Sequence, residues 1–326
     1  MGLRGRGADL VTGMAAATIL PVSLVIVSDF EPGAKSWVDE DTCLRSFLAD
    51  SGGLPSDVVI AASAQFQDSA VPDWSGLPVP VSVVFVDSQE SAQIKNGATA
   101  HVRENYVAVV EADCLCAPGW LGALYGAMIA QPDLDAVSGL TFYEPTSALR
   151  RVSSLFDRGF MLDRTTDGRV VHVSNNGALY RKDVLLRFPY APDPSPFVSA
   201  HRRQNAMRDA GVRFGLVTQA AQFHAFGGWP FIVDVRRNKG FQDAVMHPPS
   251  ARAPRSLSRR IGWYLRRFGK NILSDYRLLR RAFGVYCKPH DLPLAVLYPF
   301  IVRPIETRGA MLALRGHAAL PDTAYR

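Results

Sequence analysis

The amino-acid sequence predicts an α/β protein in which helices cover both faces of a mostly parallel β-sheet. Three observations indicate this class. Short, nearly continuous apolar runs recur in the N-terminal half of the chain, as is typical of buried parallel strands. Segments compatible with helices separate the runs, which is the alternation of an open α/β sheet. Two carboxylates stand at the end of the fourth run, where such sheets bind their ligands.

The first four strands are expected at 22–28, 57–63, 81–87 and 106–112. Helices are expected between and after them, at 37–50, 90–102 and 119–130. Downstream, "DAVSGLTFYEP" predicts a further strand with a polar exit. The Pro-rich loop 190–197 cannot continue a helix, and the following helix, 198–210, ends at Gly211 as a C-cap.

The chain length of 326 residues predicts one large domain with an appendage. We expect an N-terminal extension over 1–20, the α/β domain over 21–248 and a helical C-terminal region over 249–326. The uncharged run after Arg6 resembles a signal peptide, but Pro21 divides it and its second half is typical of a strand. Four cysteines without a CxxC pair or a Cys/His cluster indicate reduced thiols and a cytoplasmic location.

Positive charge is concentrated in the C-terminal region. Eleven Lys and Arg residues stand between Arg252 and Lys288 against Asp275 alone, whereas the whole chain has a net charge of +6. The same stretch carries an apolar stripe at helical spacing, formed by Ile261, Leu265, Phe268, Ile272, Tyr276, Leu279 and Phe283.

This cationic helix has two interpretations. It suits the surface of an anionic membrane, with Trp263 and Tyr264 at its start as interfacial residues. Alternatively, the stripe packs on the α/β domain and the charges are solvated. No nucleic-acid motif accompanies the charge, so no nucleic-acid partner is expected. The apolar stretch that follows, "LPLAVLYPFIVRP", is broken by prolines.

Glu111 and Asp113 are the strongest candidates for chemistry. They lie in "VVEADCLCAPGWL", two residues apart on an extended segment, so their side chains point the same way. Together they could hold Mg²⁺ or Mn²⁺, which would bridge to diphosphate oxygens. A solvated pair of acids at a loop is the alternative.

Four segments together resemble the family 2 glycosyltransferases, whose fold is called GT-A. They are "PVSLVIVSDF", "KNGATA", "VVEADCLCAPGWL" and "SNNGALYRKDVL", and the resemblance spans about residues 21–245. The third segment resembles the metal-binding Asp-x-Asp motif of that family, with Glu111 in place of the first Asp. The resemblance implies an α/β GT-A domain that transfers a sugar from a nucleotide diphospho-sugar to a hydroxyl, with inversion and with Mg²⁺ or Mn²⁺.

The resemblance also implies roles for individual residues. Asp113 would bind the metal, Glu111 the metal shell or the ribose, and His224 in "QFHAFGGW" would complete the metal site, although a structural histidine is the alternative. The other residues implied to contact the donor are Lys95 and Asn96, near the nucleotide, and Asn175 and Asn176, near the sugar. A solvated lysine and a turn-forming Asn pair are the alternatives for these.

Two departures from the family pattern affect recognition and catalysis. Ala61 and Ala62 stand where many relatives carry acids that bind the nucleobase, so Asp29 or Glu31 is expected to serve instead. Ser199 and Ala200 stand where inverting relatives carry the acidic general base. A histidine can act as a base near neutral pH and a serine cannot.

His201 and Asp193 are therefore the candidate bases. The acceptor is expected to be a glycan or a lipid-linked glycan, and the protein is expected in the cytoplasm or at the cytoplasmic face of the membrane. The missing acidic pair keeps a binding or scaffold protein as an alternative. A nucleotidyltransferase is a second alternative, because such enzymes also use metal-held phosphates.

Overall fold

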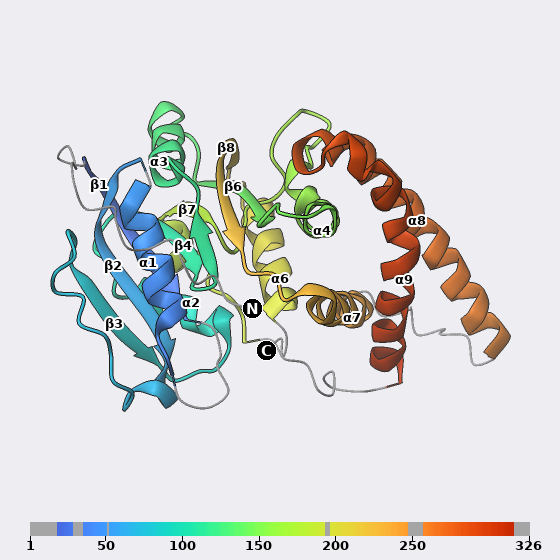
Figure 1. The fold of residues 1–326 in the computed structure, drawn as a ribbon, viewed down its shortest axis with the longest axis horizontal. Coiled ribbons are helices and arrows are strands. Elements are labelled where there is room, and N and C mark those ends of the chain that lie inside the picture. Colours follow the sequence, from blue (N-terminus) through green and yellow to red (C-terminus); the bar gives the residue numbers. More distant parts are fainter. Residues whose placement is uncertain (1–17, 29–34, 51, 193–195, 247–256, 316–326) are drawn as a thin grey trace.

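The computed structural model describes residues 18–28, 35–50, 52–192, 196–246 and 257–315 (Figure 1). Most of the predicted extension 1–20, and residues 249–256 of the predicted C-terminal region, lie outside them. So do the candidate residues Asp29, Glu31 and Asp193. The side chains of Ile261, Trp263, Tyr264 and Leu265 are also outside the description.

Within the described residues, eight strands form one sheet in the order β3-β2-β1-β4-β7-β6-β8-β5. The strands are β1 (Ile19–Val27), β2 (Leu54–Ser63), β3 (Val81–Val86), β4 (Tyr106–Glu111), β5 (Cys114–Cys116), β6 (Ala136–Tyr143), β7 (Ala178–Arg181) and β8 (Phe214–His224). β3, β2, β1 and β4 run parallel, as does the β6–β8 pair. β7 is antiparallel to both β4 and β6, and β5 is antiparallel to β8.

Two hydrophobic cores cover the two faces of this sheet, because alternate strand residues point to opposite sides. On one face α1 (Val38–Asp50) and α3 (Trp120–Ala130) pack against Leu24 and Ile26 of β1. On the other face α2 (Ser91–Thr99), α5 (Lys182–Arg187) and α6 (Pro196–Asp209) pack against Val25 and Val27. The predicted α/β fold class, with helices on both faces, is confirmed.

The edge strand β3 differs in detail from the sequence prediction. Its residues are half-buried or exposed, although the apolar run at 81–87 was expected to be fully buried. β3 pairs only with β2 within the described sheet, so its outer edge lacks the neighbour that would cover it.

The C-terminal helices α7 (Gly228–Met246), α8 (Leu257–Tyr286) and α9 (Leu292–Leu314) form a third layer beside α4 (Ala148–Arg158) (Figure 1). A third hydrophobic core joins them, and it includes Tyr276, Leu279 and Phe283 of the predicted stripe. The described C-terminal part of the stripe therefore packs against the protein. A C-terminal helical appendage is confirmed.

Close backbone contact holds α9 on α7. A Cβ on Gly240 would lie 1.8 Å from the carbonyl oxygen of Glu306, and one on Gly309 would lie 1.9 Å from that of Arg237. The sequence suggested that prolines break the last helix. This packing explains why they do not. Pro299 and Pro304 lie inside α9, where each removes one helical hydrogen bond, and contacts with α7 hold the helix together.

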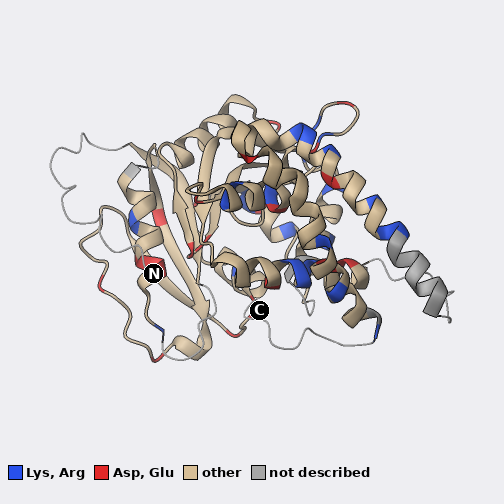
Figure 2. Cartoon of the chain, turned by 45° about the vertical axis from the view of Figure 1, so that its right-hand side comes forward, with Lys and Arg blue, Asp and Glu red and all other residues tan. Residues whose placement is uncertain are grey.

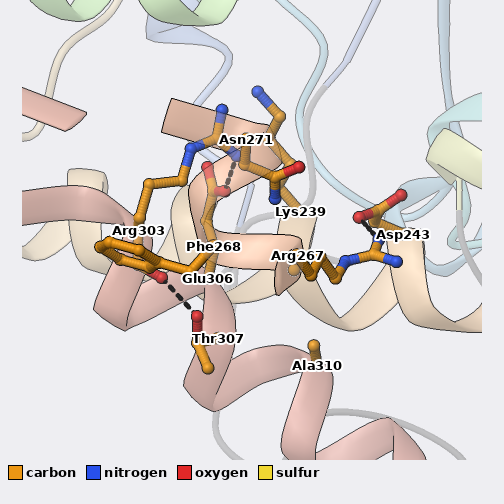
Figure 3. A pocket seen from close by; sticks show the side chains of 10 residues that line it. Lys239, Asp243, Arg267, Phe268, Asn271, Arg303, Glu306, Thr307 and Ala310 are labelled. Carbon is orange, nitrogen blue, oxygen red and sulfur yellow. Dashed lines mark hydrogen bonds and ion pairs between the residues drawn. The ribbon is translucent and has the colours of Figure 1, made fainter. Parts of the chain in front are cut away.

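Ion pairs lie in and beside the small space between α7, α8 and α9, which is lined by Arg303 with Glu306 and by Arg267 with Asp243 (Figure 3). Arg236, which is 1% exposed, reaches Asp157 at 2.6 Å and Glu306 at 3.0 Å. Arg303 pairs with Asp275 and with Glu306. None of the described helices is both long and apolar enough to cross a membrane.

Candidate active site

The carboxyl end of β4 carries the centre of the site. Glu111 is the last residue of this strand, and its carboxylate is held from two sides. Lys95 Nζ lies 2.6 Å from Oε1, and the amide nitrogen of Asn176 donates to Oε2 at 2.7 Å. Burial alone would raise the pKa of Glu111, but Lys95 and His224 outweigh it and lower this pKa to about 2. Glu111 is therefore ionised throughout the physiological range.

Asp113 and His224 meet because β5 and β8 pair antiparallel. Cys114 stands opposite His224 in that pairing, which brings His224 Nδ1 to 3.2 Å from Asp113 Oδ2. The same nitrogen lies 2.9 Å from the carbonyl oxygen of Ala225. Both oxygens can accept a hydrogen bond from Nδ1–H, so in the neutral form of the ring Nε2 is the nitrogen that can donate an electron pair to a metal. Nε2 lies 3.8 Å from Glu111 Oε2.

The electrostatics of Asp113 differ from those of Glu111. Burial and the neighbouring Glu111 carboxylate raise the pKa of Asp113 to about 7. A divalent cation at this carboxylate would offset both causes. Ligand atoms of Asp113, Cys114 and His224 lie within 4.8 Å of one another. Burial, together with the two carboxylates, also raises the pKa of the Cys114 thiol well above its usual value, so this sulfur stays protonated.

The donor set fits a divalent metal ion. Asp113 offers a carboxylate oxygen and His224 an imidazole nitrogen, whereas the Cys114 thiol is a poor ligand while it is protonated. One hard and one borderline ligand favour Mn²⁺ over Mg²⁺, which prefers oxygen ligands throughout.

The loop before β7 positions Asn176, and its sequence "SNNG" explains how. Asn176 is 5% exposed, and its Oδ1 accepts the backbone N–H of Glu111 at 3.0 Å. Its amide also donates to the Cys114 sulfur at 3.2 Å. Gly177 has a φ of +86°, and a Cβ there would lie 2.3 Å from the Gln222 amide nitrogen. This nitrogen donates to the carbonyl oxygen of Asn176 at 3.1 Å, so only glycine fits beside the glutamine.

Asn96 and Asn175 both contact Tyr190 in the loop 188–192. The Asn96 amide donates to the carbonyl of Tyr190 at 2.8 Å and accepts the N–H of the same residue at 2.8 Å. The Tyr190 hydroxyl donates to Asn175 Oδ1 at 3.2 Å. Both Asn side chains therefore hold the loop that precedes α6 in position.

The candidate base His201 is exposed on α6. Ser199, at the position where the family's acid was expected, is 1% exposed and donates to the carbonyl of Ala191 at 2.7 Å. Its hydroxyl has a structural role. Ala61 and Ala62 are buried in β2.

The sequence alone did not point to three residues of the site. Cys114 and Gln222 join it through the β5–β8 pairing. Arg158, at the end of α4, lies close enough to lower the pKa values of both Glu111 and Asp113. Cys114 could have been included because it directly follows Asp113 in the sequence. Arg158 could not, because it lies more than 40 residues from Asp113 in the sequence.

Comparisons with known proteins agree with the motifs. Residues 82–188 match the family model "Glycosyl transferase family 2". This match confirms the resemblance to the family that the sequence segments indicate. No curated protein sequence matches the chain.

Two solved structures are similar in fold. A mannosyltransferase from Pyrobaculum calidifontis, in complex with GDP-Man and Mn²⁺, is 15% identical. The match covers 94% of this chain and 79% of that one, with a TM-score of 0.44. Glucosyl-3-phosphoglycerate synthase from Mycobacterium tuberculosis, with Mn²⁺, UDP-glucose and phosphoglyceric acid, is 14% identical. That match covers 72% of this chain and 82% of the synthase, with a TM-score of 0.48.

Proposed function

We propose that this chain, with its family 2 glycosyltransferase segment at residues 82–188, moves a sugar from a nucleotide diphospho-sugar to a hydroxyl acceptor. The observation that carries the proposal is the meeting of Asp113 with His224 beside the Lys95–Glu111 pair. Acids, an imidazole and a lysine at the carboxyl ends of strands suit a metal-held diphosphate. The proposed domain limits, 21–248 and 249–326, place this site in the first domain together with α7, and α8 and α9 in the second.

Asp113 and His224 would hold the metal ion, which we propose is Mn²⁺ in preference to Mg²⁺. When bound, this ion neutralises the negative charge that develops on the departing diphosphate. Glu111 would contact the metal shell or the ribose. Its two partners, Lys95 and Asn176, keep its carboxylate ionised and in one orientation. Lys95 also places an ammonium group beside the diphosphate.

The acceptor hydroxyl oxygen would attack the anomeric carbon from the side opposite the diphosphate. The new glycosidic bond forms as the bond to the diphosphate oxygen breaks, which inverts the configuration at that carbon. The proton of the hydroxyl passes to a general base, for which His201 and Asp193 remain the candidates. We propose that Asn96 and Asn175 contribute by holding the loop between β7 and α6, and that Asp29 or Glu31 recognises the nucleobase.

A binding or scaffold protein is the second candidate, and the burial of Ser199 favours it. The residue at the expected base position is enclosed and bonded to Ala191, so it cannot take a proton from an acceptor. A general base contributes about 10²–10⁴-fold to a rate. A scaffold would therefore keep donor binding and lose turnover.

A thermal-shift screen of nucleoside diphosphates, with and without Mn²⁺, tests the proposal. We expect one nucleotide to raise the melting temperature only when Mn²⁺ is present. Asp113→Asn should remove most of that shift, because loss of one ligand weakens metal affinity at least about 10–100-fold. Asp209→Asn, at an exposed carboxylate at the end of α6, is the matched control and should keep the full shift.

Turnover then separates the candidates. Release of the nucleoside diphosphate from the matching nucleotide-sugar supports the transferase. Metal-dependent binding without release across a donor panel supports the scaffold. Pyrophosphate release from a nucleoside triphosphate and a sugar phosphate would instead identify a nucleotidyltransferase. An equal shift for Asp113→Asn and the parent protein would contradict the assigned metal site.

We also propose a cytoplasmic location and a glycan or lipid-linked glycan as acceptor. The support for a lipid-linked acceptor is the cationic C-terminal region, because its positive charge suits the surface of an anionic membrane.

A further inference from the structure

Helix α9 exposes a row of large apolar side chains. Leu292, Val296, Leu297, Phe300 and Ile301 are each between 37% and 56% exposed. They form two series with a spacing of four residues, 292/296/300 and 297/301, which together occupy one half of the helix circumference. The opposite side of α9 is buried in the C-terminal core. Isolated exposed apolar residues are ordinary, but a continuous row of five marks an interaction surface.

Helix α8 exposes a row of cations. Arg266, Lys270, Arg277 and Arg280 are exposed and recur at spacings that keep them on one side of the helix. Leu273, which is 54% exposed, stands among them. Figure 2 shows the basic positions repeating along this helix. Within the described residues, no acidic side chain pairs with these four cations.

Two other arginines of α8 have acidic partners, unlike the four cations of the row. Arg267 pairs with Asp243, and Arg281 pairs with Asp163. These two ion pairs link α8 to α7 and to the segment that follows α4. Among the described side chains of α8, the four cations without an acidic partner all lie on the exposed side of the helix.

The two helices that carry these rows pack against each other. The Tyr276 hydroxyl of α8 donates to the Val296 carbonyl of α9 at 3.0 Å, and Arg303 of α9 pairs with Asp275 of α8. The helices are therefore aligned side by side, as Figure 1 also shows. Both bury their inner sides in the same core, through residues such as Leu279 and Tyr298. The cations of α8 and the apolar residues of α9 therefore lie on the exposed sides of two adjoining helices, and we call these exposed sides together the α8–α9 surface.

We propose that this α8–α9 surface docks on the face of an anionic phospholipid bilayer. The apolar row would enter the boundary between head groups and acyl chains, while the cations bind lipid phosphates. A second copy of the chain fits poorly, because a symmetric contact would oppose two unpaired cationic rows. A nucleic acid would use the cations but leave the apolar row in water. The inference is independent of the proposed transferase function, since it concerns a different surface.

Co-sedimentation of the full chain with vesicles tests this surface without donor or metal. We expect binding to vesicles of equal parts phosphatidylglycerol and phosphatidylcholine, and little binding to phosphatidylcholine alone. Added salt should weaken it, because surface charges are screened. Each cation contributes about a fivefold gain in binding, so Arg277→Glu with Arg280→Glu should weaken it about 20-fold or more. Leu297→Ser with Phe300→Ser should weaken it about tenfold or more.

Matched controls separate the surface from overall charge and apolarity. Arg103→Glu with Arg208→Glu makes the same charge change at exposed sites elsewhere. Ile129→Ser with Leu186→Ser removes two side chains that are 50% and 57% exposed elsewhere. Both controls should bind as the parent protein does.

Three outcomes would overturn the proposal. The first is equal or absent binding to both vesicle types, and the second is an equal loss in the α8–α9 variants and their controls. The third is a dimer, detected by sedimentation equilibrium, that Leu297→Ser with Phe300→Ser dissociates; this result would assign the apolar row to a second copy. Donor binding and turnover are measured separately, so failure here leaves the transferase proposal unaffected.

Discussion

Buried carboxylates occur in two regions of this protein and behave in opposite ways. Between α7 and α9, burial tends to raise the pKa of Glu306, but Lys239, Arg236 and Arg303 outweigh it and lower this pKa. At the carboxyl end of β4, burial and Glu111 raise the pKa of Asp113 to about 7. Both regions enclose several charges, but the second leaves one acid, Asp113, whose pKa nearby cations do not bring down.

The difference separates a structural charge cluster from a binding site. A buried acid with enough cations around it needs no further counter-charge, and removing one of those cations strongly destabilises the folded protein. An acid left in excess needs a cation from outside, and it is costly to the folded protein until that cation arrives. Glu111 belongs with the satisfied acids, because Lys95 and His224 hold its pKa at about 2.

The largest effect is expected in the helical region. Arg236→Met removes the buried arginine that Asp157 and Glu306 share and should lower the free energy of unfolding by about 3–5 kcal/mol. Denaturant titration measures it. Arg213→Met is the matched control, because the Arg213–Asp133 pair is half exposed and such pairs contribute about 0–1 kcal/mol. Equal losses in the two variants would remove the distinction between the regions.

A smaller effect, of opposite sign, is expected at Asp113. The carboxyl has a pKa of 3.8 as its reference and about 7 in the folded protein. The unfolded chain therefore loses this proton first as pH rises, and the metal-free protein loses stability between about pH 4 and pH 7. Above that window Asp113→Asn should stabilise the metal-free protein by about 1–3 kcal/mol.

Without metal the Asp113→Asn variant should be more stable than the parent protein, and with Mn²⁺ the parent protein should be the more stable of the two. The metal stabilises the parent protein and has a weaker site in Asp113→Asn, as denaturant titration with chelator and then with Mn²⁺ would reveal. If the Asn variant is less stable than the parent in chelator, Asp113 is not an acid in excess.

An effect no larger than that of Asp113→Asn is expected at the glycine that shapes the site. Gly177→Ala introduces a Cβ at a φ of +86° and forces Gln222 away from Asn176. It should destabilise the protein by about 1–3 kcal/mol and weaken Mn²⁺ binding, because Asn176 positions Glu111.

Gly168→Ala isolates the backbone contribution. Gly168 has a φ of +83°, and a Cβ added there would have no neighbouring atom within 4 Å, so only backbone strain of about 1 kcal/mol is expected. Mn²⁺ titration of both variants checks the site effect. Unchanged Mn²⁺ affinity in Gly177→Ala would show that Asn176 does not support the metal site.

Much of the fold could be predicted because its signals are local. The apolar runs and the alternating helical segments identify the parallel half of the sheet and the helices on both faces. The antiparallel insertion of β7 between β4 and β6 carried no such signal, because strand order depends on contacts between distant segments. The prolines of α9 misled the prediction for the same reason, since the packing that tolerates them comes from α7.

The sequence by itself determined that Glu111 and Asp113 end a buried strand and that Lys95 stands near the site, since local spacing and strand direction suffice for this. It also determined that a cationic helix follows the α/β domain. Only the tertiary structure decided that His224 meets Asp113, that Asn96 holds the Tyr190 loop, and that α9 exposes its apolar row. These outcomes depend on which distant segments lie side by side, and the free energy of such contacts belongs to the whole packed chain.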